Sequence, residues 1–387
     1  MLPIKYNVRS LMVRKVGTFM TLSGIAVTVG VVVALMALAM SLQRALVSTG
    51  SDRNVLVLRT GAIAESNSAI TREQFGVLRY LPEIARDAGE RPLASAELCL
   101  PLYLSRGKGL GGNVLLRGVE PVAFKVHDKV RLLPGGRMFR PQAGECIIGT
   151  GVSRRYAKAV GVGRKIKFGL REWEVVGVFE AGGSGFESEI WTDVTDLMGD
   201  YKRPHFSSVT FRLANPSSFS TVERLMAEDP RLGLRAQIES RYYEKQAETM
   251  MQMKGLAMII TLLMSVGAVF AAMNTMYASV AGRTREIAAM RAVGFRQSQI
   301  LWSFVLESML LTVAGGVVGC VLALPVEGFS SGSMNFRSFS ETTFSLHITF
   351  PLMLMGIGFS AFMGLLGGFF PAWQASRLPI LQALREQ

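Results

Sequence analysis

Four long apolar segments constrain what this chain can fold into more than any other feature. Residues 16–43, 255–282 and 342–376 contain no Lys, Arg, Asp or Glu, and residues 299–326 contain a single acid, Glu307. About 20 apolar residues are enough to cross the hydrocarbon core of a bilayer as a helix. Only 18% of the chain is charged, against about 25% in soluble domains. The sequence therefore predicts an integral membrane protein, and it excludes a disordered chain and an ordinary cytosolic enzyme.

The first apolar segment has a second interpretation, a cleaved signal peptide. Ala37-Leu38-Ala39 resembles a cleavage site. However, the apolar run over residues 16–41 is far longer than the roughly 7–15 residues of a signal peptide. We therefore favour an uncleaved membrane anchor.

Basic residues beside the apolar segments predict their orientation, because short cytoplasmic loops are enriched in Lys and Arg. Residues 1–17 carry four basic side chains and no acid, and residues 283–298 carry four arginines against Glu286. Both termini and residues 283–298 are therefore expected in the cytoplasm. The expected division is an amphipathic segment with the first span (1–42), an extracytoplasmic domain with its stalk (43–254), the second span (255–282), a cytoplasmic helix (283–298), the third span (299–326), an external loop (327–347), the fourth span (348–374) and a cytoplasmic tail (375–387).

The segment between the first two spans alternates strand-like and helical patterns. Alternating apolar residues are typical of half-buried strands, and Asn215-Pro216 is typical of a helix start. We also expect residues 240–254 to form a helix that runs into the second span as a stalk. The fold class predicted is an α-helical membrane protein with four transmembrane helices and a large mixed α+β external domain. Strands are expected at 54–60, 113–119, 146–149, 165–169, 172–180 and 208–213, and helices at 71–86 and 216–228.

Motifs for catalysis, cofactors or metals are not supported by this sequence. Residues 107–112 match G-x-G-x-x-G by letter, but a strand pattern follows them, so we expect a hairpin loop. Residues 182–185 lack the spacing of a nucleophile elbow and are expected to form a mobile loop. His127, His205 and His347 are isolated in sequence, without metal-ligand spacing. We therefore expect no catalytic, cofactor-binding or metal-binding residues.

The overall charge and the cysteines add two weaker expectations. The net charge of +13 lies mostly beside the apolar segments, so it fits membrane topology better than nucleic-acid binding. Cys99 and Cys146 fall in the external domain, where a disulfide or two free thiols are both possible chemically. Cys320 is expected to be a small packing residue of the third span.

The basic segment after the second span has the pattern of a short amphipathic helix. Ile287, Met290 and Val293 recur every three residues, and Gly294 follows as a helix C-cap would. We expect these apolar side chains to share one face, with charged residues on the others. The alternative is a basic linker that serves only to orient the spans.

Four blocks of the sequence resemble the MacB/FtsX-type permeases of ABC transporters. MNTMYASVAGRTREIAAMRAVGF (273–295) resembles the end of the family's second transmembrane helix and its coupling helix. NVRSLMVRKVGTFMTLSGIAVTVGVVV (7–33) resembles its entry helix and first span. LLTVAGGVVGCVLA (310–323) resembles its glycine-rich third helix, and FFPAWQASRLPILQALRE (369–386) resembles its fourth-helix exit and tail. The external domain resembles the family only loosely, from residue 144 to residue 180.

The resemblance implies a device that works with partners. MacB itself carries a fused ATPase, but residues 1–387 contain no G-x-x-x-x-G-K-[ST] sequence. We therefore expect no ATP hydrolysis by this chain and a separate ABC ATPase, in two copies, that binds ATP and Mg. The family also implies a second permease chain, identical or paralogous, and a bacterial inner-membrane location, and it leaves open a periplasmic adaptor or an outer-membrane component. The residues that would contact the ATPase are Arg285, Glu286, Ile287, Met290, Arg291, Val293 and Gly294.

Two functions and two intramembrane features follow from this resemblance. ATP-driven motion would serve the export or handling of lipophilic, lipoprotein or peptide-like cargo; the alternative is a signalling scaffold that regulates an external cell-wall hydrolase. A membrane-anchored enzyme is disfavoured because no catalytic cluster is found. Within the spans, Glu307 is expected to pair with an arginine rather than to couple protons or substrate. Small-residue faces for close helix packing, within one chain or between two, are expected at Gly315, Gly316, Gly319, Gly364 and Gly368.

Overall fold

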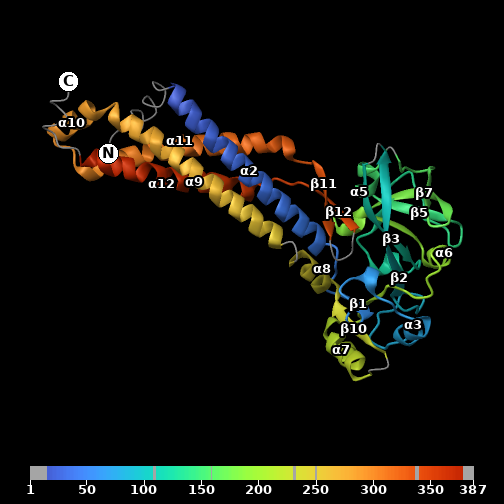
Figure 1. Ribbon diagram of the computed structural model, residues 1–387. Coiled ribbons are helices and arrows are strands. Elements are labelled where there is room, and N and C mark those ends of the chain that lie inside the picture. Colours follow the sequence, from blue (N-terminus) through green and yellow to red (C-terminus); the bar gives the residue numbers. More distant parts are fainter. Residues whose placement is uncertain are drawn as a thin grey trace. The chain divides into compact units, whose positions relative to one another are not determined.

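The computed structural model describes residues 15–107, 110–157, 159–229, 232–248, 251–335 and 340–377 (Figure 1). These fall into two compact units. The membrane unit comprises Met1–Met40, Gln252–Gly328 and Leu346–Gln387. The external unit comprises Ser41–Met251 and Phe329–Ser345.

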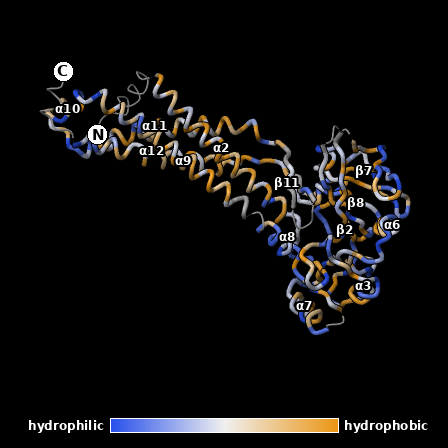
Figure 2. The backbone as a smooth tube through the Cα atoms, in the orientation of Figure 1, coloured by the Kyte–Doolittle hydropathy of each residue, from blue (hydrophilic) through white to orange (hydrophobic). Residues whose placement is uncertain are grey.

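The membrane unit is built from long helices that are apolar along most of their length (Figure 2). In the described residues, four helices are long and apolar enough to cross a membrane, which agrees with the predicted fold class. The first continues to Val47, past the end expected for the span, and carries the chain into the external unit. The helices are α2 (Lys15–Val47), α9 (Met251–Ala281), α11 (Gln297–Ala323) and α12 (Phe350–Ser376).

Glycines allow the long helices of the membrane unit to pack closely. A Cβ at Gly319 of α11 would lie 2.5 Å from the carbonyl oxygen of Ala26 in α2, so only glycine fits there. Gly316 packs in the same way against Ser360 of α12. Gly315 faces α2, whereas Gly364 and Gly368 face α11. The glycines expected at helix contacts therefore pack within one chain.

The external unit contains a ten-stranded mixed sheet. Its strand order is β10-β1-β9-β2-β3-β8-β5-β7-β4, with β6 paired to β7. Neighbours are antiparallel except for β3–β8 and β5–β7, which are parallel. The strands are β1 (Asn54–Arg59), β2 (Ala94–Gly107), β3 (Leu110–Val119), β4 (Arg131–Leu132), β5 (Glu145–Gly149), β6 (Lys165–Phe168), β7 (Arg171–Glu180), β8 (Glu189–Asp193), β9 (Ser208–Arg212) and β10 (Leu234–Ile238).

All six strands expected from the sequence are present in the ten-stranded sheet, and the other four strands of this sheet, β2, β4, β8 and β10, were not expected. In β2, Glu97 interrupts the apolar pattern, and β8 is only five residues long with an acid at each end, so neither shows a clear pattern. Of the hairpin loop expected at residues 107–112, Gly107 pairs with Leu110 between β2 and β3, and residues 108–109 lie outside the described part. Apolar side chains on the sheet form the core, with Trp173 and Trp191 fully buried.

Short helices flank the sheet. The helix expected at 71–86 is wrong in length, because α3 (Arg72–Leu78) stops two turns earlier and leads into a turn before Pro82. The start at Asn215 is confirmed, since its side chain accepts a hydrogen bond from the Ser217 amide. The remaining elements are η1 (Glu65–Asn67), α4 (Ala123–Val126), α5 (Thr150–Arg155), η2 (Gly185–Ser188), α6 (Val194–Asp200), η3 (Pro216–Ser218), α7 (Phe219–Glu228) and α8 (Glu239–Glu248).

Two connecting segments complete the external unit. Residues 240–248 lie in α8 and residues 251–254 lie in α9. Residues 249–250 lie outside the described part, so the continuous stalk expected at 240–254 stays a prediction. After η4 (Leu324–Val326), the segment expected as an external loop at 327–347 contains a hairpin of β11 (Ser330–Asn335) and β12 (Ser340–Ser345). Its Glu341 lies 2.8 Å from Arg155 of α5. This ion pair links the hairpin to α5 within the external unit.

Candidate functional site

A buried arginine organises the centre of the external unit. Arg117 on β3 is 1% exposed, yet its guanidinium lies among three carboxylates. Nε and Nη2 donate to Glu189 at 2.7 and 3.0 Å, and Nη1 and Nη2 donate to Glu65 at 2.8 and 3.1 Å. Nη1 also donates to Glu97 at 2.6 Å. The planar fork of an arginine suits two bidentate pairs of this kind, which a lysine could not form.

A histidine extends this network toward the helix that leaves the unit. Nε2 of His127 lies 2.8 Å from Glu97, and Nδ1 lies 3.4 Å from Glu239, the first residue of α8. Glu239 also accepts hydrogen bonds from the Ser51 amide at 3.0 Å and the Asn54 side chain at 2.9 Å. The network therefore joins residues that enter the unit after α2 to the helix by which the chain leaves it.

Electrostatics keep the histidine charged. Burial alone would lower the pKa of His127, but Glu97 and Glu239 outweigh burial and raise that pKa to about 10. Burial would likewise raise the pKa of Glu97, yet His127 and Arg117 hold it at about 2. Burial dominates at Glu189 and raises its pKa, although Arg117 opposes the change. At neutral pH the network thus contains two buried cations, Arg117 and His127.

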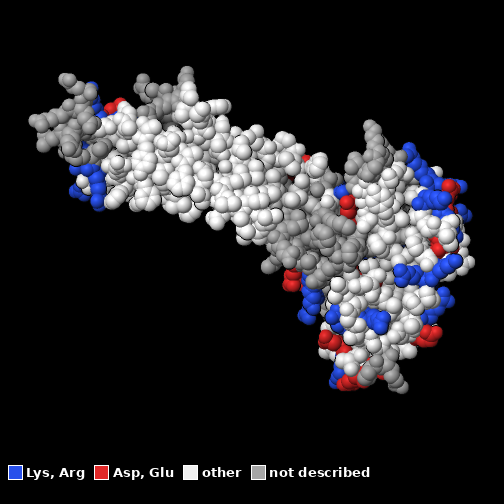
Figure 3. Space-filling model, viewed as in Figure 1, with Lys and Arg blue, Asp and Glu red and all other residues white. Residues whose placement is uncertain are grey.

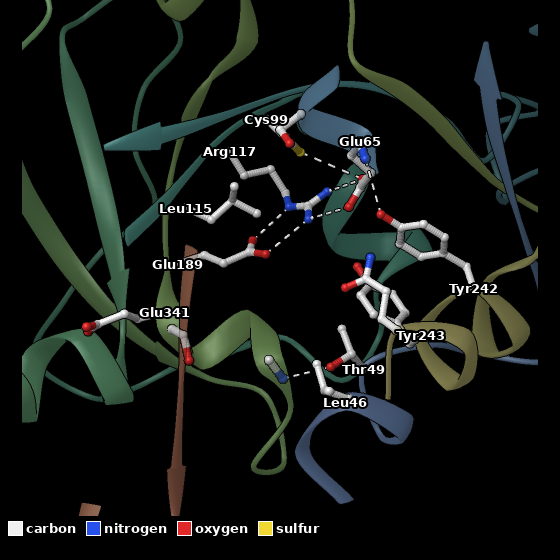
Figure 4. Close-up of a pocket in the computed structure, with 14 residues that line it drawn as sticks. Leu46, Thr49, Glu65, Cys99, Leu115, Arg117, Glu189, Tyr242, Tyr243 and Glu341 are labelled. Atoms are coloured by element: carbon white, nitrogen blue, oxygen red, sulfur yellow. Dashed lines mark hydrogen bonds and ion pairs between the residues drawn. The ribbon is translucent and has the colours of Figure 1, made fainter. Parts of the chain in front are cut away.

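A small cavity lies beside the buried arginine (Figure 4). Its volume is about 40 Å³, which is room for a few water molecules and too little for a drug-sized ligand. Figure 4 shows Arg117 between Glu189 and Glu65, with Tyr242 reaching Glu65 from α8. The wall also includes residues from the end of α2, the loop before β8 and the β11–β12 hairpin, namely Leu46, Thr49, Gly185, Ser188 and Glu341.

The cavity carries no activated nucleophile among its described residues. Cys99 lies against it with Sγ 3.7 Å from Glu65, but burial raises the pKa of this thiol far above its usual range. A protonated thiol is a poor nucleophile. Cys99 and Cys146 are both free and buried, so they do not form the disulfide that the sequence left open. No group of three or more His, Cys, Asp or Glu with metal-binding geometry occurs in the described residues.

Sequence reasoning missed the residues of this network. His127 was read as an isolated histidine, because its partners Glu97 and Glu239 are far away in the sequence. One available signal was a charged residue inside an apolar strand, as Arg117 in NVLLRGV. A buried charge requires a partner, so such a position points to an ion pair.

The short helix after the second span corresponds to the expected coupling segment. It is α10 (Thr284–Ala292), and Figure 3 shows basic residues gathered near it while the visible surface of the long helices is almost uncharged. Val293 is 82% exposed, and Arg285, Glu286 and Gly294 are also exposed.

The three apolar side chains expected on one face of this helix do not share one environment. Ile287 is fully buried against α9, α11 and α12, and Met290 is half-buried against the same cluster. Arg291 is half-buried too. The sequence spacing placed all three on one side, but burial between the helices proved more favourable for Ile287 than exposure. The exposed side chains of this segment therefore include Arg285 and Glu286 of α10 and Val293, the residue that follows it.

The acid within the third span has the partner that was expected. Nη1 of Arg283 lies 3.1 Å from the carboxylate of Glu307, which is 2% exposed. Arg283 precedes α10 directly. The ion pair thus links the start of α10 to α11.

Comparisons with known proteins place the chain in a family. Residues 18–228 match the MacB-like periplasmic core domain, and residues 258–380 match the FtsX-like permease C-terminal domain. The first match alone covers more than half of the chain. The chain therefore belongs to the MacB/FtsX-type family of ABC transporter permeases and is a multi-pass membrane protein.

Curated relatives agree with this assignment. The macrolide export ATP-binding/permease protein MacB of Bdellovibrio bacteriovorus is 26% identical over 97% of this chain and 60% of that protein. MacB 2 of Aeromonas hydrophila is 26% identical over 98% of this chain and 59% of that protein. The chain thus spans about 60% of the length of these relatives.

Solved structures similar to this chain include two external domains. The extracellular domain of the transporter YknZ from Gram-positive bacteria has 14% identity and a TM-score of 0.37, covering 48% of this chain and 99% of that one. The periplasmic region of MacB from Actinobacillus actinomycetemcomitans has 12% identity and a TM-score of 0.39, covering 52% and 94%.

Proposed function

We propose that this chain is the membrane subunit that transmits ATP-driven motion of a separate ABC ATPase to its external domain. The motion would serve the export or handling of lipophilic, lipoprotein or peptide-like cargo. ATP and Mg would bind to two ATPase subunits, beneath a pair of permease chains. Signalling to an external cell-wall hydrolase would use the same transmission step, and it stays an alternative that differs only in what the external domain acts on.

The observation that best supports this proposal is the division of α10 into two faces. Ile287 anchors the helix in a cluster with residues of α9, α11 and α12. Val293, Arg285 and Glu286 remain on the open side. A force applied to the open side would therefore reach three long helices through the buried side, because packed interiors transmit strain.

The proposal includes an orientation in the bacterial inner membrane. The basic residues around α10 favour the cytoplasm for this helix and for both termini. The external unit would then lie outside the cytoplasm, together with the β11–β12 hairpin. A periplasmic adaptor would contact that side.

Two substitutions of opposite charge at Val293 test the role of α10. An apolar anchor in a groove of the ATPase would tolerate neither Val293→Asp nor Val293→Lys, because each buries an unpaired charge. The cost of about 3 kcal/mol corresponds to roughly 100-fold weaker binding. The measurement is the amount of ATP-binding subunit that co-purifies with each full-length variant in mild detergent.

A matched control is Leu170→Asp, which places the same charge at a side chain of the external unit that is 72% exposed. It should retain the wild-type amount of ATPase. Met290→Asp is a poorer test, since Met290 packs inside the membrane unit and its loss would disturb that packing. Retention of the ATPase by both Val293 variants means that α10 is not the contact.

A further inference from the structure

The chain passes between the two units four times. The first two crossings, residues 49–54 after α2 and residues 239–248 of α8, touch inside the external unit. A Cβ at Gly50, three residues after α2, would lie 2.5 Å from the Cα of Ser240 in α8. The Ser240 hydroxyl is hydrogen-bonded to Asp52. Just beyond, Val55 of β1 pairs with Ile238 of β10. The two crossings are therefore in backbone contact as well as side-chain contact.

One carboxylate holds these two crossings together. Glu239 belongs to the leaving helix α8, but one of its oxygens accepts from Ser51 and Asn54 of the entering segment. Its other oxygen faces His127 at 3.4 Å. Glu239 is 2% exposed, so water does not screen these contacts.

His127 continues the connection into the sheet. Its second nitrogen reaches Glu97 on β2, and Glu97 accepts from Arg117 on β3 at 2.6 Å. A continuous series of charged contacts thus runs from both crossings to the central strands. Tyr242, one turn along α8, adds a parallel contact by accepting from the Glu65 amide at 3.1 Å.

Stability alone gives a weak reason for this arrangement. Burying several charges costs desolvation energy, and well-packed apolar residues often stabilise a core as well or better. Buried ionic groups do, however, fix one particular arrangement of the segments that carry them, because alternatives leave a charge unpaired. The network therefore suits a contact that must keep one geometry while the attached helices move.

We propose that Glu239 and His127 are positioning residues that make the two crossings move as one body and pass their displacement to β2 and β3. This inference rests on the proposed transmission of motion. We call this contact between the two crossings, held by Glu239 and His127, the joint. With the joint intact, movement of α2 and α9 would reach the central sheet. Without it, α8 would move against the sheet and the displacement would be lost.

Hydrogen exchange of the full-length chain in detergent tests the joint without any ATPase. In Glu239→Gln and His127→Gln, exchange should become about 10-fold faster or more in residues 49–54 and 239–248 together, since local opening exposes these amides. Exchange elsewhere in the external unit should stay as in the wild type. Glu239→Gln keeps an acceptor oxygen for the Ser51 amide, so we expect this variant to fold. It therefore allows the test even where His127→Gln does not fold.

A matched control is Asp87→Asn. Asp87 also accepts from a cation, Lys125 at 2.8 Å, and from backbone amides, but it lies outside the network. Its variant should leave both crossing segments unchanged. A uniform rise of exchange across the unit in the Glu239 and His127 variants, or no rise in either crossing, overturns the joint and indicates an ordinary stabilising contact.

A second readout separates this inference from the function on which it rests. A fluorescent probe at Tyr80→Cys, a position 70% exposed on the external unit, reports ATP-dependent change in the reconstituted complex with its ATPase. Glu239→Gln should keep ATP hydrolysis but lose most of the probe response. A full response in this variant overturns the joint. If the wild type gives no response, the proposed transmission fails, and hydrogen exchange still decides the joint.

Discussion

Replacing Arg117 with methionine tests how the external unit tolerates its buried charges. Methionine fills a similar volume but removes the guanidinium that pairs with Glu65, Glu97 and Glu189. Breaking a buried pair by removing one partner costs about 3–5 kcal/mol, because the remaining charge is left uncompensated. We expect the free energy of unfolding to fall by at least that amount, since three carboxylates lose a partner at once.

Thermal unfolding of the full-length chain measures the effect. Each kcal/mol lowers the Tm of a domain of 150–250 residues by about 2–4 °C, so a loss of about 6–20 °C is expected. Fluorescence of Trp191 reports on the site, because its indole donates to Glu189 at 2.7 Å. The control is Arg91→Met, whose side chain is 74% exposed and pairs with Asp87. Exposed pairs contribute about 0–1 kcal/mol, so the control should change the Tm little.

The same variant should show a distinctive pH dependence. Burial already raises the pKa of Glu189 in the wild type, and loss of Arg117 removes the opposing charge. A carboxyl whose pKa is higher in the folded state takes up protons on folding, so its destabilising effect grows as the pH rises through that pKa. The deficit of Arg117→Met should therefore shrink as the pH falls from 8 to 5. A Tm loss no larger than that of Arg91→Met, at any pH, would refute the reasoning.

Two further predictions concern the membrane unit and its orientation. Gly316→Val should lower the yield of folded chain in detergent, because the valine side chain would collide with Ser360. The control Gly358→Val, on an open side of α12, should keep the wild-type yield. Equal yields of the two variants would contradict the close packing. In intact cells, an impermeant maleimide should label Leu170→Cys but not Ser298→Cys, because only residue 170 would lie outside the cytoplasm. The native cysteines are buried, so they add little background labelling. Equal labelling of the two variants across a sealed membrane rules out the proposed orientation.

The four spans and the family could be predicted from residues that are close together in the sequence. Three uncharged segments of 28 residues or more, and a fourth of 28 residues in which Glu307 is the only charge, leave few alternatives to membrane helices, because backbone groups in lipid must be satisfied within the segment. The pairing of Glu307 with an arginine could also be predicted, since an acid in a span requires a partner nearby. Six strands of the external unit followed from alternation along single stretches of chain.

Contacts between residues far apart in the sequence could not be predicted, because they depend on how the elements pack. His127 looked isolated because Glu97 and Glu239 reach it from β2 and α8, and strand order is not encoded in any local pattern. The face of α10 was also misjudged, since a spacing of three residues does not say which side a neighbouring helix covers. Local periodicity fixes which side chains share a face, whereas burial depends on the partner that packs against it, and that partner is set by the whole fold.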